Sequence, residues 1–267
     1  MNTGLTETDA AAGRWVLGLI VVVAIAAGIY YWTQRQAEQP PPAAGTAAAP
    51  QEEPSEPAKS IEHPVEAPGI GPLPALGESD EAAASSLAAA FPEGQFGRLF
   101  VGSDLVRRIT VTIDNLPRQK VAARLRPLKP IPDAFVAIGP EEAPMLDESN
   151  YARYRPYIDI VGAIDAKQAA AAYRRLYPLF QEAYEELGNP SAYFNDRVID
   201  VIDHLLEAPE VRGPIPLARP NVLYEFADPE LERLSAGQKF LVRIGPDNAA
   251  RLKAKLRELR AELASRE

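Results

Sequence analysis

Carboxylates and an imidazole are concentrated in the stretch YFNDRVIDVIDHLLE, residues 193–207. Asp200 and His204 are four residues apart, a spacing that places both side chains on one face of a helix. Such a pair could bind a metal ion or exchange protons with a substrate, with Asp196 or Asp203 assisting. These polar residues also form one continuous arc opposite an apolar arc, which is the pattern of an ordinary hydrated helix face.

The composition restricts the chemistry of this stretch. The chain has no cysteine and two histidines, His63 and His204. A zinc site normally uses three or four protein ligands that include further imidazoles or thiolates, and an all-carboxylate magnesium or calcium site would not need His204. The glycine patterns of nucleotide-binding loops and the nucleophile elbow of serine hydrolases do not occur. We therefore assign no catalytic residue, no metal ligand and no cofactor, and keep Asp200 and His204 as candidate binding residues.

A second candidate site is basic. Five cationic residues and no acid lie between residues 115 and 132, and the segment is too rich in proline for a regular helix or strand. Arginine suits bidentate recognition of carboxylate or phosphate, so the segment could contact an anionic glycan, a lipid headgroup or a protein. The alternative is that these charges neutralise acids of the same domain. The candidate binding residues are Arg118, Lys120, Arg124 and Arg126, with Lys129 following them.

Tyrosines form a third group. Seven tyrosines and Phe194 lie at helical spacings between residues 151 and 194. Such residues could stack on sugar rings, but at helical spacing they usually form a core with one polar edge each. Tyr157 lies off the apolar stripe of its helix, so we expect it to be the exposed member and a candidate binding residue.

The elements that must position these residues are mostly helices. Apolar residues recur every three or four positions, and serine, asparagine or aspartate precedes several of these runs as a helix cap. The predicted fold class is an all-α domain over residues 76–267, with a minor β hairpin that pairs residues 134–139 with 143–147. The expected helices cover residues 81–91, 105–116, 151–164, 166–187, 194–207, 228–244 and 246–264. For residues 105–116 the valine, isoleucine and threonine content favours a strand as the alternative.

The N-terminal part has a different character. After a tail of residues 1–14, the stretch from Trp15 to Trp32 contains no charged residue and has aromatic residues at both ends. Its 18 residues would span about 27 Å as a helix, close to the thickness of the hydrocarbon core of a bilayer. This pattern predicts one transmembrane helix over residues 15–32. A short N-terminal tail and a large C-terminal part favour a C-terminal domain outside the cytoplasm.

Residues 33–75 are rich in proline, alanine and glutamate, which predicts a disordered linker. Residues 33–80 hold eight acidic and two basic residues and so carry most of the net charge of −9. The acidity therefore belongs mainly to the linker. Together with the predicted location, the acidic balance argues against nucleic acid as a partner.

Several stretches resemble one bacterial family, the domain of unknown function 3014. They are DLVRRITVTIDNLPRQKVAARLRPLKP, NYARYRPYIDIVGAID, YRRLYPLFQEAYEELG, YFNDRVIDVIDHLLEAPEV and YEFADPELERLSAGQKFLVRIGPDNAARLKAKLREL. The resemblance covers about residues 73–264. It implies a single N-terminal span, a low-complexity linker and a folded domain in the bacterial envelope, and it implies no activity.

The function expected from these features is that of a binding or scaffolding module. It would be tethered to the bacterial inner membrane by one span, with the helical domain in the periplasm engaging a protein or an anionic envelope polymer. Local concentration near that partner would rise through tethering alone. The alternative is an envelope hydrolase that acts on glycan or peptide through carboxylates of the 196–207 helix.

Overall fold

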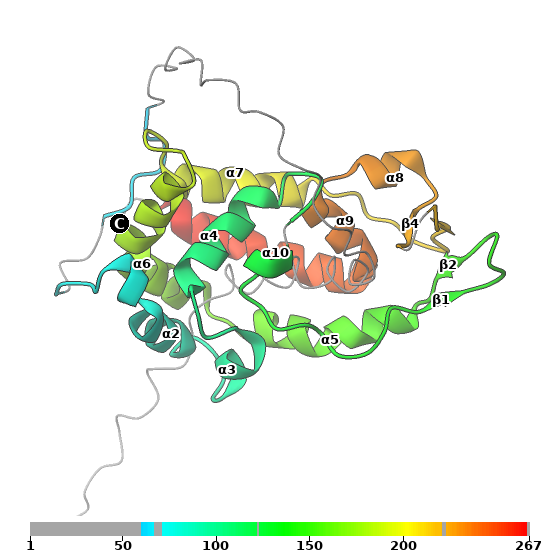
Figure 1. Ribbon diagram of the computed structural model, residues 1–267, viewed down its shortest axis with the longest axis horizontal. Helices are drawn as coiled ribbons and strands as arrows, with labels where there is room; N and C mark the ends of the chain where they lie inside the picture. The colour runs from blue at the N-terminus through cyan, green and yellow to red at the C-terminus, as the bar shows by residue number, and fades with distance from the viewer. Residues whose placement is uncertain (1–59, 67–70, 122, 221–222, 266–267) are drawn as a thin grey trace, which may run out of the picture.

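The computed structural model describes residues 60–66, 71–121, 123–220 and 223–265. The predicted transmembrane helix, residues 15–32, lies outside these residues, and no helix within them is long and apolar enough to cross a membrane. Figure 1 shows a largely helical domain from which a small hairpin projects. The helices are α2 (Asp80–Ala88), α3 (Gln95–Leu99), α4 (Leu105–Asn115), α5 (Ser149–Gly162), α6 (Ala166–Glu186), α7 (Phe194–Leu206), α8 (Pro229–Arg233), α9 (Ala236–Arg243) and α10 (Pro246–Ala264), with single 3₁₀ turns at Leu76–Glu78 and Ala123–Leu125.

The predicted mainly helical class and the predicted hairpin are confirmed. Strand β1 (Ala137–Ile138) pairs antiparallel with β2 (Met145–Leu146). A second pair, β3 (Leu217–Ala218) with β4 (Glu225–Phe226), was not predicted, and neither was α3. Both hairpin regions share a small apolar cluster that lies apart from the main core.

The helix expected over residues 228–244 is wrong as a single element. It is two helices, α8 and α9, separated by Leu234 and Ser235. The Ser235 side chain accepts a hydrogen bond from the backbone N–H of Gln238, which is the geometry of a helix N-cap. The first N–H groups of α9 donate to the carbonyls of Arg118 and Leu116, at 2.7 and 3.0 Å, so the chain after α4 holds the start of α9.

Helix α10 is the element around which the other long helices pack. It contacts α5, α6 and α7, and Figure 1 shows α5 and α7 on opposite sides of it. Its apolar stripe, spaced by four, three and four residues, is buried along its whole length. Burying a leucine side chain contributes about 1.5–3 kcal/mol, so this stripe is a major source of stability. The stripe consists of Leu252, Leu256, Leu259 and Leu263.

Helix α6 begins and ends where the sequence predicts. The Asp165 carboxylate accepts hydrogen bonds from the N–H groups of Lys167 and Gln168. The helix continues through Pro178, and Gly188 follows it with φ 95°, a conformation that favours glycine. The aromatic face of α6 is inside the core, where the ring of Phe180 stacks on Tyr173 and on Phe194 of α7.

Helix α4 is tied to its neighbours by two aspartates. The Asp80 carboxylate, at the start of α2, accepts hydrogen bonds from the N–H groups of Asp104 and Leu105 and thereby caps α4 from another helix. At the far end, the buried Asp114 carboxylate pairs with Arg197 of α7 at 3.0 Å. A charge buried in this way needs such a partner, because its desolvation is otherwise uncompensated.

The ordered contacts begin earlier than the predicted domain boundary at residue 76. Residues 60–66, called here the docked segment, lie against the N-terminal end of α7 although they fall within the predicted linker. The Asp196 carboxylate accepts the N–H groups of Glu62 and His63 at 3.1 and 2.8 Å. The Tyr193 hydroxyl accepts the N–H of Val65 at 2.7 Å. Composition alone did not reveal this attachment, because its partners are distant in sequence.

Phe180 provides a test of the core. Its side chain is fully buried between α6 and α7, so Phe180→Ala should lower the free energy of unfolding by about 3–5 kcal/mol through the cavity that it leaves. Urea unfolding of the purified full-length chain, followed by circular dichroism, measures this loss. Glu182→Ala, on the exposed face of the same helix, is the matched control and should change stability by less than about 0.5 kcal/mol. Similar losses for the two variants would contradict the packing.

Candidate functional site

The acidic residues of α7 do not converge on one point. The Asp196 carboxylate is occupied by the docked segment. Asp203 forms a bidentate ion pair with Arg260 of α10, with N–O distances of 2.5 and 2.7 Å. Asp200 is exposed and makes no ion pair with any residue in the described ranges. The pattern is that of a helix face with structural contacts at its ends and a hydrated middle, without two facing carboxylates.

His204 is only partly on that hydrated face. The imidazole is half-buried, and its Nε2 lies 2.8 Å from the Ser235 hydroxyl. Desolvation by burial lowers the pKa of His204; the charge of Glu207 raises it and that of Arg197 lowers it. The expectation of an outward-facing imidazole is therefore corrected: His204 links α7 to the cap of α9. Ser235 is itself buried and serves as that cap, so this serine–imidazole pair is part of the fold.

No group of three or more histidine and acidic side chains in the described part of the chain is arranged to hold a metal ion. On α7, Asp200 is exposed and Asp203 pairs with Arg260. Asp200 and His204 therefore do not act as a pair in this structure.

The basic residues of the segment 115–132 are dispersed. Arg118 pairs with Asp114 at 2.7 Å, while Lys120 and Arg124 are exposed. Arg126 is 4% exposed, and its guanidinium donates to the carbonyl of Val121. Arg126 therefore cannot reach an external polymer, and its selection as a candidate binding residue is corrected. An irregular segment has no period from which the direction of each side chain could be predicted.

The tyrosines divide into buried and partly buried groups, and Tyr151 and Tyr193 are partly buried like Tyr157, so Tyr157 is not the single exposed member that the sequence predicts. Tyr154, Tyr173, Tyr177 and Tyr184 are buried, whereas Tyr157 remains half-exposed. Burial raises the pKa of Tyr157, and the charges of Arg153 and Arg98 oppose that rise. The Tyr157 hydroxyl is thus close to two cations.

Tyr157 lines a hollow of about 890 Å³ between α3, the segment after residue 128 and α5, called here the α3–α5 groove. The apolar part of its lining includes Leu99, Ile131 and Ile160, with four prolines. The cations Arg98, Lys129 and Arg153 and the acids Asp133 and Asp159 complete the charged part. A wall of mixed aromatic, apolar and cationic groups is suited to a large ligand that carries both rings and negative charge.

Two sets of hydrogen bonds fix the positions of the segments that form the walls of the groove. The backbone N–H of Lys129 donates to the Leu99 carbonyl at 2.8 Å, and its side chain reaches the Gly97 carbonyl, so the end of α3 and the proline-rich segment form one wall. On the other side, the Arg153 guanidinium donates to the carbonyls of Asp133 and Ala134, both at 2.9 Å. Asp133 has φ 68°, a strained conformation for a residue other than glycine, and these bonds hold it.

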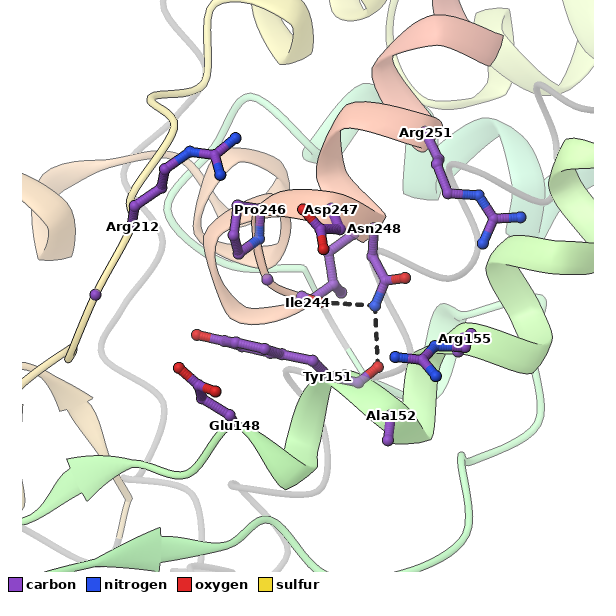
Figure 2. Close-up of a pocket in the computed structure, with 12 residues that line it drawn as sticks. Glu148, Tyr151, Ala152, Arg155, Arg212, Ile244, Pro246, Asp247, Asn248 and Arg251 are labelled. Atoms are coloured by element: carbon purple, nitrogen blue, oxygen red, sulfur yellow. Dashed lines mark hydrogen bonds between the residues drawn. The ribbon is translucent and has the colours of Figure 1, made fainter.

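A second hollow of about 550 Å³, called here the α5–α10 pocket, lies on another side of α5. Figure 2 shows the ring of Tyr151 beneath the start of α10, with the Asn248 amide donating to the Tyr151 and Ile244 carbonyls. Gly245 has φ 88°, and a Cβ on it would lie 2.6 Å from the Tyr151 ring. Only glycine therefore allows the ring and the helix to meet and form the base of this pocket. The charged residues around it are Glu148, Arg155, Arg212, Asp247 and Arg251.

Sequence reasoning found part of the groove and none of the pocket. Tyr157 was selected because it lies off its helical stripe, and Lys129 belongs to the basic segment. Arg98 gave no signal, since it is a single charge within a short helix, α3, that was not predicted. Arg155, Arg212 and Arg251 are isolated in sequence and come together only in the folded chain.

His204 should make stability depend on pH. Because its pKa is lowered in the folded state, the neutral imidazole stabilises the fold above pH about 6.5, the usual pKa of the unfolded side chain. This contribution is lost as the pH falls toward the lowered value. His204→Gln should cost about 1 kcal/mol at pH 7.5 and a smaller amount at pH 5, as measured by urea unfolding.

The matched control is Arg175→Gln, which alters an exposed residue of α6 away from His204. It should leave the difference in unfolding free energy between pH 7.5 and pH 5 as in the unaltered chain. A cost of His204→Gln that does not shrink at low pH would show that the imidazole titrates as it does in water.

The comparisons with known proteins agree with the resemblance found in the sequence. A family model described as Protein of unknown function (DUF3014) matches residues 105–260, from the start of α4 to near the end of α10. No curated protein and no solved structure matches the chain. The match includes the whole α5–α10 pocket and the α5 side of the groove, and it leaves α2 and α3 outside. Because it spans more than half of the 267 residues, the chain belongs to the DUF3014 family.

Proposed function

We propose that the protein is a binding module of the bacterial cell envelope that holds an anionic glycan polymer in the α3–α5 groove. The observation that carries this proposal is the position of Tyr157 in a hollow of about 890 Å³ that also contains Arg98 and Lys129. A sugar ring can stack on a tyrosine face, and the flanking cations attract the negative groups of the polymer.

The charges of the groove favour a polymer over a compact ligand. Arg98 is exposed and makes no ion pair within the described residues, whereas Arg153 is occupied in holding the groove wall. Arg98, which is available to a ligand, therefore lies on the α3 side of the groove, and Tyr157 lies on the α5 side. A chain that crosses from one side to the other would use both, and its repeating units would each add a weak contact.

The membrane setting is part of the proposal. A span over residues 15–32 would anchor the protein in the inner membrane in a single pass, and the linker would carry the helical domain into the periplasm. Support comes from the uncharged aromatic-ended stretch and the proline-rich acidic stretch after it. A periplasmic domain would meet envelope glycans and would have no nucleic acid partner.

The alternative hydrolase is less well supported by the geometry. Catalysis of glycoside hydrolysis needs two carboxyl groups that face each other across a cleft. On α7, Asp196 and Asp203 are engaged by backbone N–H groups and by Arg260, and Asp200 is exposed alone. No observation therefore favours this reaction over binding.

The membrane setting predicts a defined topology. When the full-length chain with a C-terminal tag is expressed in a bacterium with two membranes, protease added to intact spheroplasts should remove the tag. A cytoplasmic marker protein must survive the same treatment. If the tag is degraded only after the spheroplasts are lysed, the helical domain is cytoplasmic and the envelope setting is wrong.

The groove proposal is tested by co-sedimentation. The full-length chain in detergent micelles should pellet with insoluble peptidoglycan sacculi, and binding should weaken as salt is raised because charges contribute to it. The double variant Arg98→Gln, Tyr157→Ala should reduce the affinity at least tenfold. Arg175→Gln, which removes an exposed arginine of α6, is the matched control and should pellet like the unaltered chain.

Two results would reject the groove proposal. One is a chain that stays in the supernatant at every sacculus concentration, and the other is a double variant that pellets as well as the unaltered chain. Unfolding curves of the double variant establish that a loss of binding does not come from a loss of structure. Equal pelleting with neutral cellulose would show that negative charge on the polymer is not recognised.

A further inference from the structure

The α5–α10 pocket contains charges of both signs that do not neutralise one another. In the part of the chain that the structure describes, Arg155, Glu148 and Asp247 form no ion pair, although all three line the same hollow of about 550 Å³. Arg251 pairs with Asp159 at 2.7 Å, but its side chain remains 46% exposed. Opposite charges that line one cavity without contact are free to bind a ligand that carries both.

The two signs occupy different sides of the pocket. Figure 2 shows Glu148 and the Tyr151 hydroxyl on one side and the guanidinium groups of Arg155 and Arg251 on the other. The Glu148 charge contributes, after burial, to raising the pKa of Tyr151, which agrees with a short distance between the carboxylate and that hydroxyl. Asp247 lies at the start of α10, between the two sides.

Arg212 is the exception, because it lies on the side of Glu148. It is ion-paired with Glu210, and its side chain is 70% exposed. It therefore belongs to the rim, where solvent screens its charge. Of the two cations on the other side, Arg155 forms no ion pair within the described residues, and Arg251 pairs with Asp159.

We propose that this pocket binds a small zwitterion of the class of α-amino acids and short peptides. The carboxylate of the ligand binds Arg155, whose planar guanidinium group can donate two hydrogen bonds to it, and the half-exposed Arg251 adds positive charge on the same side. The ammonium group binds Glu148 and Asp247, and the ring of Tyr151 provides the apolar base between them. This site is separate from the α3–α5 groove and does not depend on the function proposed for that groove.

The charges distinguish this ligand class from simpler ions. An anion alone would meet the two carboxylates, and a cation alone would meet the arginines, so each would lose part of its attraction. A ligand with both charges satisfies both sides. The volume is within the range of about 300–1,000 Å³ typical of small-molecule sites and is large enough for more than a single amino acid.

The experiment compares a zwitterion with two probes that each carry one of its charges. Binding of L-alanyl-L-alanine, acetate and methylammonium to the full-length chain in detergent micelles is measured by calorimetric titration and by saturation-transfer NMR. The dipeptide should bind at least tenfold more tightly than either single ion. Equal affinity for acetate would show a plain anion site, and no detectable binding of the dipeptide at 10 mM would also overturn the proposal.

Variants of Arg155 and Glu148 test the basic and the acidic side of the pocket separately. Arg155→Gln and Glu148→Gln should each weaken binding of the dipeptide at least tenfold, and the loss with Glu148→Gln should vanish when acetate is the probe. Arg175→Gln is the matched control and should bind like the unaltered chain. If Glu148→Gln binds the dipeptide as tightly as the unaltered chain, the acidic side has no role and the assignment fails. The readout is independent of sacculus pelleting, so either proposal can fail alone.

Discussion

The burial of the leucine stripe of α10 determines where the other long helices can lie. The stripe is buried along its whole length, from Leu252 to Leu263, and α5, α6 and α7 all contact this helix. Polar contacts then set the position of α10 along its axis: Asn248 holds its start to α5, and Arg260 holds its end to Asp203 of α7. Because helix packing is dense, a shift of α10 would move both walls of the pocket beside α5.

The charges of the domain fall into two classes. Buried ones serve the fold, as Asp114 does for α4 and α7, and as Lys255 does by donating to the Ile164 carbonyl at the end of the turn before α6. Such groups are too costly to leave unpaired and are unsuited to exchanging ligands. Among the described residues, charges without an ion pair line both hollows beside α5, at Arg98 on one side and Arg155 on another. The unpaired Asp200 of α7 lines neither hollow, which is the reason to place binding at α5 and not at α7.

Much of the fold could be predicted because a helix buried on one side leaves a period in its sequence. The caps at Asp165 and Gly188 and the stripe of α10 are examples. The break at Ser235 could not, since a serine within an apolar pattern fits either a continuous helix or a cap. The candidate sites were found only at Tyr157 and Lys129. Arg98 and Arg155 owe their role to neighbours from distant segments, and no local pattern encodes such proximity.

The docked segment determines where a pulling force on the N-terminal side of the chain would first act on the domain. Three backbone N–H groups, those of Glu62, His63 and Val65, are held by Asp196 and Tyr193 at the first turn of α7. The His63 carbonyl is held by Asn195, which also donates to Leu263 near the C-terminal end of α10. A pull on the chain from its N-terminal side is therefore received by the junction of α7 and α10 before it can reach α2 and α3, so the α3 wall of the groove is shielded from the load.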